Sequence, residues 1–128
     1  MDTEVISRDF LPSSGEGGYI MNSDASNKPG RHWVALYFPR NEAVEFVDSL
    51  GHPPEYYNIT TWNYYKYNMI KLQSDQSQSC GYFCLYYIIH RSRGRSMETI
   101  MKDFTSDLYK NEKTVRTFIS NYHIPKTR

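Results

Sequence analysis

Residues 32–48, HWVALYFPRNEAVEFVD, contain two short runs of strand-forming residues separated by a turn. The first run, residues 32–38, is almost continuously apolar and is followed by Pro39. The second run, residues 43–48, ends in Asp48. β-Branched and aromatic residues bounded by turn formers are typical of strands joined in a hairpin. We therefore expect an antiparallel pair, in which the first residue of one strand lies beside the last residue of the other.

This pairing is expected to bring His32 and Asp48 to the same end of the sheet. His32 alone is more typical of a polar residue at a strand end. Together they provide a base and an acid that orients it, which is what a thiol nucleophile requires. Structural roles before a double proline or at helix ends suffice for the other three histidines: His52, His90 and His123.

A candidate nucleophile lies where a polar loop, residues 73–79, meets an apolar helix predicted over residues 80–92. Cys80 opens that helix, and the positive end of a helix favours a thiolate. Gly81 would let a substrate approach the backbone closely. A structural thiol is the alternative for Cys80, and Cys84, one turn further along the apolar face, is expected to be an inert core thiol.

Gln73 begins the same loop and offers a side-chain amide that can stabilise an oxyanion together with the backbone N–H of Cys80. Gln76 and Gln78 lie in this loop as well, so the residue type alone does not single out Gln73. We expect a glutamine in a polar loop to support little packing.

The remaining strands are less clearly marked. Residues 19–22 read as a short extended segment, and residues 69–72 as a third strand. The aromatic residues of 55–68 follow neither the helical nor the strand period, although Pro53 and Pro54 can start a short helix.

Two further helices are predicted towards the end of the chain. Ser96 is expected to cap one that continues to Phe104, and Asn111 to cap another over residues 112–122. Strands that come first and helices that follow indicate an α+β fold, and residues 1–128 are expected to form one domain.

The composition and charge of the chain do not indicate a protein that binds nucleic acid. The 128 residues are 39% hydrophobic and 23% charged, with a net charge of +1, which does not indicate a polyanion-binding protein. The only basic cluster, Arg91, Arg93 and Arg95, falls at a predicted helix end, where cations complement the helix dipole.

The two cysteines suit neither a disulfide framework nor a zinc site, so we expect no metal, no cofactor and a reducing intracellular compartment. No run is long and apolar enough for a membrane span or a signal peptide, so no membrane association is expected.

Taken together, GRHWVALYF, EFVDSLG and LQSDQSQSCGYFC resemble the cysteine proteases encoded by adenoviruses and by their relatives in virus-like DNA transposons. The resemblance covers about residues 19–95. It implies a papain-like site in which the cysteine helix packs on a small central mixed sheet, with His32 as base, Asp48 as orienting acid, Gln73 in the oxyanion hole and Cys80 as nucleophile.

The resemblance also implies that Trp33, Asn22 and Gly81 bind the substrate. Trp33 is either a core residue or a wall of the narrow cleft before the scissile bond, and the family favours the cleft. Cleavage of viral or virus-like precursor polypeptides after small residues, often glycine, is then expected, by a monomer in the virion or host nucleus. DNA or a peptide are the activators known in this family, but no cysteine precedes Gln73, so disulfide-linked activation is not expected. The short flanks suggest a minimal or incomplete form.

Two other functions remain open. A protease that removes SUMO-like or ubiquitin-like modifiers shares the same residue types, but its cysteine usually follows an acidic residue, where this chain has Ser79. A catalytically inactive binding module is the third interpretation, and it has no need of all four site residues.

Overall fold

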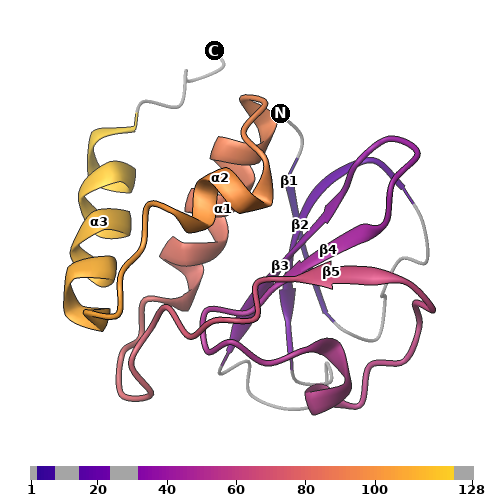
Figure 1. Ribbon diagram of the computed structural model, residues 1–128, viewed down its shortest axis with the longest axis horizontal. Coiled ribbons are helices and arrows are strands. Elements are labelled where there is room, and N and C mark those ends of the chain that lie inside the picture. Colours follow the sequence, from indigo (N-terminus) through magenta and orange to yellow (C-terminus); the bar gives the residue numbers. More distant parts are fainter. Residues whose placement is uncertain (1–2, 8–14, 24–31, 123–128) are drawn as a thin grey trace.

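A five-stranded mixed sheet forms the centre of the computed structural model, which describes residues 3–7, 15–23 and 32–122 (Figure 1). The strands are adjacent in chain order: β1 Thr3–Ser7, β2 Gly17–Asn22, β3 Trp33–Phe38, β4 Val44–Val47 and β5 Tyr65–Tyr67. Strand β3 is antiparallel to both β2 and β4. The edge strands pair in parallel, β1 with β2 and β5 with β4. The fold is therefore α+β, as predicted from the order of strands and helices, and its sheet is mixed, as the family resemblance implies.

The hairpin predicted from residues 32–48 is present. Strand β3 pairs with β4 so that Ala35 lies opposite Val47 and Tyr37 opposite Glu45. Side chains of β3 alternate between two apolar clusters. Val34 and Leu36 belong to one of them, whereas Ala35 belongs to the other. Because β3 is buried on both faces, its sequence is nearly continuous in apolar residues.

Three helices lie together on one side of the sheet in Figure 1: α1 Cys80–Ser92, α2 Met97–Met101 and α3 Leu108–Asn121. Helix α1 packs directly on β2 and β3, and α3 packs on α1. The other side of the sheet is covered by the segment that begins with the short 3-10 helix η2 Pro54–Tyr57. The sheet thus positions the start of α1 beside the start of β3.

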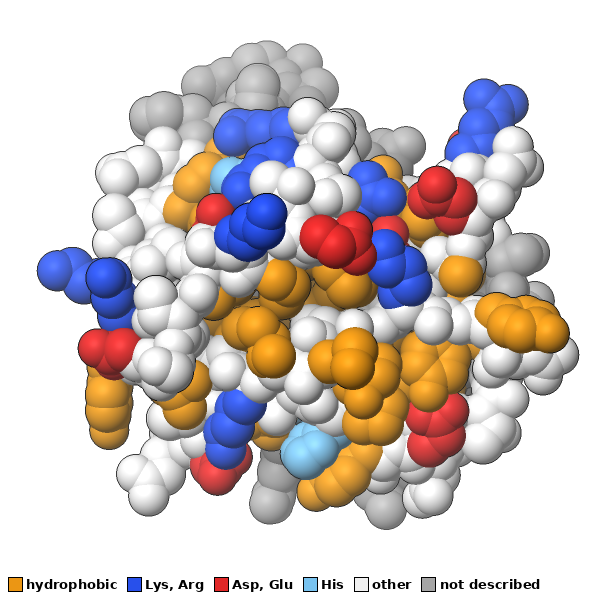
Figure 2. Space-filling view, viewed as in Figure 1, with side chains coloured by type: hydrophobic (Ala, Val, Ile, Leu, Met, Phe, Trp, Pro, Cys, Tyr) orange, Lys and Arg blue, Asp and Glu red, His pale blue; other side chains and the backbone are white. Residues whose placement is uncertain are grey.

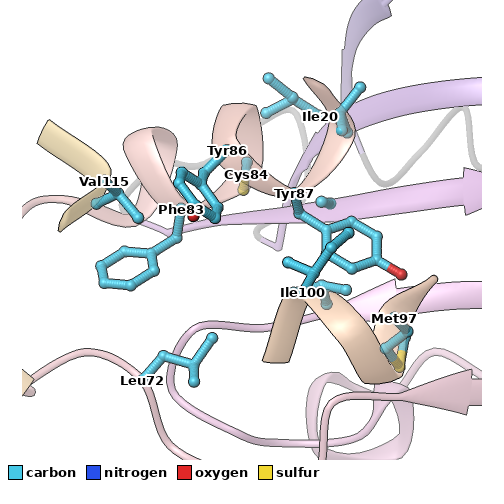
Figure 3. Packing of buried hydrophobic residues seen from close by; sticks show 12 residues of the cluster. Ile20, Leu72, Phe83, Cys84, Tyr86, Tyr87, Met97, Ile100 and Val115 are labelled. Atoms are coloured by element: carbon cyan, nitrogen blue, oxygen red, sulfur yellow. The ribbon is translucent and has the colours of Figure 1, made fainter. Parts of the chain in front are cut away.

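The core between α1 and the sheet is built around Tyr87, which is 1% exposed (Figure 3). Figure 3 shows it between Ile20 and Ile100, with Cys84 one turn earlier on α1. Burying an apolar side chain of this size contributes about 1.5–3 kcal/mol. This packing holds α1 against the sheet.

The basic cluster at the end of α1 is structural. Arg91 donates to the buried carboxylate of Glu45, with Nε 3.0 Å from Oε1. Arg95 pairs with Asp103 at 2.7 Å, and Arg93 lies over the ring of Phe118. Each of these arginines thus has a partner within the fold. On the face shown in Figure 2, basic and acidic side chains are likewise intermixed.

One predicted strand is wrong, and two strands of the sheet were not predicted. Residues 69–72 do not form a strand, because Asn68 turns the chain inward and Met69 has a positive φ of 65°. The strand in this region is β5, and the aromatic segment that showed no clear period contains it. The edge strand β1 was not predicted either.

The predicted helix boundaries also need correction. Helix α2 is capped by Ser96, as expected, but ends at Met101. Helix α3 begins earlier than predicted, because the side chain of Asp107 accepts a hydrogen bond from the N–H of Lys110 and caps the helix there. Asn111 is a buried residue within α3. His123 lies outside the described residues. Within the described ranges, no helix combines the length and the hydropathy needed to cross a membrane.

Candidate active site

His32 and Asp48 meet at one end of the sheet, as the hairpin predicts. His32 immediately precedes β3 and Asp48 immediately follows β4. The His32 Nε2 atom lies 2.6 Å from Asp48 Oδ1. This contact uses one ring nitrogen for the carboxylate and leaves Nδ1 for the thiol of Cys80.

Asp48 is fully buried and is held as a carboxylate by several donors. The N–H of Leu50 donates to Oδ1 at 2.9 Å, and the Tyr57 hydroxyl donates to Oδ2 at 2.5 Å. Burial raises the pKa of Asp48, but the hydrogen bonds from His32, Tyr57 and Leu50 and the charge of His32 outweigh this and lower it. Asp48 is therefore ionised wherever the fold is intact near neutral pH.

Tyr57 and Asn68 complete the surroundings of Asp48, and the sequence did not reveal either. The ring of Tyr57 also stacks on His32, with centroids 6.0 Å apart. The Asn68 side chain accepts from the Asp48 N–H at 3.0 Å and donates to the Asp48 carbonyl at 2.7 Å. Both residues come from the aromatic-rich segment, whose pattern carries no signal for either role.

Cys80 is the first residue of α1, at the positive end of this helix. Burial raises the pKa of the Cys80 thiol. The hydrogen bond to His32, the backbone N–H groups of Trp33 and Gly81 and the charge of His32 outweigh burial and lower the pKa. For His32, burial lowers the pKa, but hydrogen bonds to Asp48 and Cys80 and their charges raise it to about 9. A thiolate paired with an imidazolium is the state that these shifts favour near neutral pH.

Cys84 provides the contrast on the same helix. It is buried in the core cluster beneath α1. Burial raises the pKa of the Cys84 thiol, and the nearby charge of Cys80 adds to this. A thiol of this kind stays protonated and unreactive at neutral pH.

Gln73 lies beside Cys80 but is not the lightly packed loop residue that the sequence suggested. It is 2% exposed. Its Oε1 accepts a hydrogen bond from the Ser49 hydroxyl, and its Nε2 donates to the Ser77 carbonyl at 2.9 Å. Gln73 is buried because the backbone N–H groups of Leu72 and Gln73 both donate to the Ser49 carbonyl. These bonds hold the start of the loop against the turn after Asp48. An amide NH₂ group has two hydrogens, so Nε2 can donate to a further acceptor.

A cavity of about 520 Å³ opens at this point. Its lining comes from the end of the hairpin, the loop before α1 and the start of α1: His32, Trp33, Leu50, Gln73, Asp75, Ser77, Gln78 and Cys80. The thiol of Cys80, the imidazole of His32 and the amide of Gln73 thus line the same cavity. In the described ranges, no cluster of three or more His, Cys, Asp or Glu side chains could hold a metal ion.

The three residues expected to bind substrate lie in different positions. Trp33 packs against the core beneath α1 and also lines the cavity. Gly81 has open space where a Cβ would be, so the side-chain face of this residue is open. Asn22 lies opposite Trp33 in the β2–β3 register but is not among the residues that line the cavity.

Comparisons with known proteins point to viral proteases. No protein-family model matches the chain. Over 102 residues the chain is 30% identical to the R355 protein of Acanthamoeba polyphaga mimivirus, which carries the name of a thiol protease. This match covers 68% of the chain and 33% of that protein. The crystal structure of the ASFV pS273R protease superposes with a TM-score of 0.50 at 22% identity, covering 77% of the chain and 40% of that protein.

The fold is therefore that of a viral protease, and the sequence similarity is to a viral protein named as a thiol protease. The chain spans about a third of the length of the curated relative. Neither comparison singles out the adenoviral branch that the sequence resembles.

Proposed function

We propose that this chain is a cysteine endopeptidase, with Cys80 as nucleophile, His32 as base and Asp48 as the acid that orients the imidazole. The observation that carries the proposal is the contact of His32 Nε2 with Asp48 Oδ1 at 2.6 Å, on a histidine that is also hydrogen-bonded to Cys80 at the mouth of a helix. A nucleophile, a base and an orienting group in this order are the requirement for covalent catalysis by a thiol.

In the proposed reaction, the Cys80 thiolate attacks the carbonyl carbon of the scissile peptide bond and forms a tetrahedral oxyanion. The imidazolium of His32 then gives its proton to the departing amine, and the C–N bond breaks to leave a thioester on Cys80. Water, deprotonated by His32, attacks the thioester and releases the acid product with the free thiol. Asp48, ionised and buried, stabilises the imidazolium in both halves of the reaction.

The oxyanion requires donors that are already in place. We assign this role to the side-chain amide of Gln73 and the backbone N–H of Cys80. Gln73 is held on both sides by Ser49 and Ser77, and it lines the same cavity as Cys80. A donor fixed before the reaction loses little free energy in reorganising, which makes it effective.

The proposed substrates are viral or virus-like precursor polypeptides cut after small residues. Trp33 contributes a large ring to the cavity wall beside His32 and Cys80, and Leu50 adds an apolar wall. A hollow confined in this way suits glycine or another small residue just before the scissile bond. The resemblance to adenoviral proteases supports this substrate class, and the name of the mimivirus relative supports proteolysis by a thiol.

Cleavage profiling on a peptide library tests the proposal, with the Cys80→Ala variant as the matched control. We expect cleavage by the unmodified chain, a preference for glycine at one or both positions before the bond, and no cleavage by the variant. Equal acceptance of bulky residues at both positions would remove the specificity claim and return Trp33 to a core role. Cleavage that persists in Cys80→Ala would refute the proposed nucleophile.

A further inference from the structure

Helix α1 differs from the other two helices in how its amino end is capped. Ser96 and Asp107 cap α2 and α3 in the usual way, since each side chain accepts a hydrogen bond from a backbone N–H in the first turn. Ser79 occupies the same position before α1, and its side chain makes no such bond. A serine at this position ordinarily is a favourable cap, so the absence of the bond in α1 requires a cause.

The cause is a pair of residues on α3. The Ser79 hydroxyl donates to Oε1 of Glu112 and accepts from Nε of Arg116 at 2.8 Å. Its one proton and one of its lone pairs are therefore engaged away from α1. Ser79 is fully buried, and its backbone has ψ of 11°, whereas Ser96 has the extended ψ of 162° that suits a cap.

Glu112 and Arg116 also contact the loop before α1 and helix α1 itself. Glu112 also accepts from the Ser77 hydroxyl at 2.9 Å, and the Ser77 carbonyl accepts from Gln73. The guanidinium of Arg116 lies over the ring of Tyr82 on α1, 4.5 Å from its centroid. Hydrogen bonds from Ser79 and Ser77 lower the pKa of Glu112, so it stays an acceptor. The loop that carries Gln73 and leads to Cys80 is thus fastened to α3.

We propose that Glu112 and Arg116 are positioning residues that hold the Ser79 hydroxyl off the amino end of α1, so that the first amide groups of this helix stay open to the Cys80 thiolate and to the substrate oxyanion. This inference rests on the proposed function. A bound cap would occupy donors at the positive end of the helix, which is the end that stabilises a thiolate. The Gly81 N–H already interacts with the Cys80 sulfur.

A double-mutant design tests this role. The readout is the pH dependence of Cys80 alkylation by iodoacetamide, followed by mass spectrometry, which reports the thiol pKa without requiring cleavage. Glu112→Ala removes both the acceptor of the Ser79 hydroxyl and the ion-pair partner that holds Arg116 beside it, so the hydroxyl can turn to cap the helix. This should raise the thiol pKa by about 0.5–1, because a cap is worth about 1 kcal/mol and one pKa unit is 1.36 kcal/mol. In Ser79→Ala/Glu112→Ala no hydroxyl remains, and the thiol pKa should return towards that of the unmodified chain.

Among the described residues, His32, Tyr57 and Cys84 are coupled electrostatically to Cys80, Asp48 lies behind His32, and Asp75 lines the same cavity; none of them is changed in these variants. Lys113→Ala, at the next, exposed position on α3, is the matched control and should not shift the thiol pKa.

Simple removal of a negative charge predicts the opposite result. If Glu112→Ala lowers the thiol pKa or leaves it unchanged, or if the double variant keeps the full shift, the role of Glu112 is refuted. If the unmodified chain cleaves no peptide but the variants show the expected alkylation profiles, the proposed peptidase function is refuted and the positioning role of Glu112 stands.

Discussion

The charge state of the His32–Cys80 pair decides at which pH the site works. Both shifts act in the same direction, because the thiol pKa is lowered and the His32 pKa is raised to about 9. As pH rises through the lowered thiol pKa, the thiolate forms and kcat/KM should increase. As pH rises further through about 9, His32 loses the proton that the leaving amine needs, and kcat/KM should fall. We predict a bell-shaped profile with its alkaline limb near this value, and a profile that still rises beyond it would contradict the assignment.

Gln73 supports both catalysis and packing. Gln73→Ala should lower kcat by roughly 10²–10³-fold, as loss of an oxyanion donor does. It should also lower the free energy of unfolding by about 1–3 kcal/mol, because the Ser49 hydroxyl and the Ser77 carbonyl lose a buried partner. Single-turnover kinetics and urea denaturation measure the two effects. Gln76→Ala, at an exposed position of the same loop, is the control; a Gln73→Ala variant with an unchanged rate would exclude Gln73 from the mechanism.

At the scale of elements, Asn111 joins α3 to the segment that leads into the active-site loop. Its Nδ2 donates to the Leu72 carbonyl at 3.1 Å and to the Thr105 carbonyl at 2.7 Å, and its Oδ1 accepts from the Thr105 N–H at 2.8 Å. Asn111→Ala leaves these buried groups unpaired and should cost about 1–3 kcal/mol of unfolding free energy in urea denaturation. The exposed Asn63→Ala should change it little, and equal effects of the two would show that these bonds are not important for stability.

The elements that the sequence predicted well are those with local signals. The hairpin of β3 and β4 has a continuous apolar run and a turn, and α1 has an apolar face together with a polar loop before it. The edge strands β1 and β5 pair in parallel with segments distant in the chain, so no local pattern marks them. Asn111 has the residue type of a cap, but tertiary hydrogen bonds place it inside α3, and Asp107 is the cap.

The same distinction applies to the site. His32 and Asp48 could be paired from the hairpin register, and Cys80 from its place before an apolar helix. Tyr57, Asn68 and Glu112 reach the site only through the tertiary fold, so no pattern in the sequence marks them. The burial of Gln73 was missed for the same reason, because the turn that covers it begins at Ser49.

At the scale of the whole molecule, charge argues against strong binding to nucleic acid. The net charge is +1, and the arginines at the end of α1 are engaged by Glu45, Asp103 and Phe118. We predict that duplex DNA binds no more tightly than about 10⁻⁶ M at physiological salt, the upper end of non-specific affinity. Fluorescence anisotropy of labelled duplex DNA measures this affinity. The salt concentration is varied from about 50 to about 200 mM, the range over which affinity that depends on phosphate contacts falls steeply. Tighter, strongly salt-dependent binding would contradict it and support activation by DNA.

The most direct test of the central claim is the pH dependence of Cys80 alkylation by iodoacetamide in the unmodified chain and in His32→Ala. The account predicts that Cys80 reacts faster than the buried Cys84 at neutral pH, with a thiol pKa below its ordinary value. In His32→Ala the hydrogen bond and the positive charge are lost, so the thiol pKa should rise and the reaction at neutral pH should slow. Equal labelling of the two cysteines, or a Cys80 profile that His32→Ala leaves unchanged, would contradict a thiolate–imidazolium pair at this site.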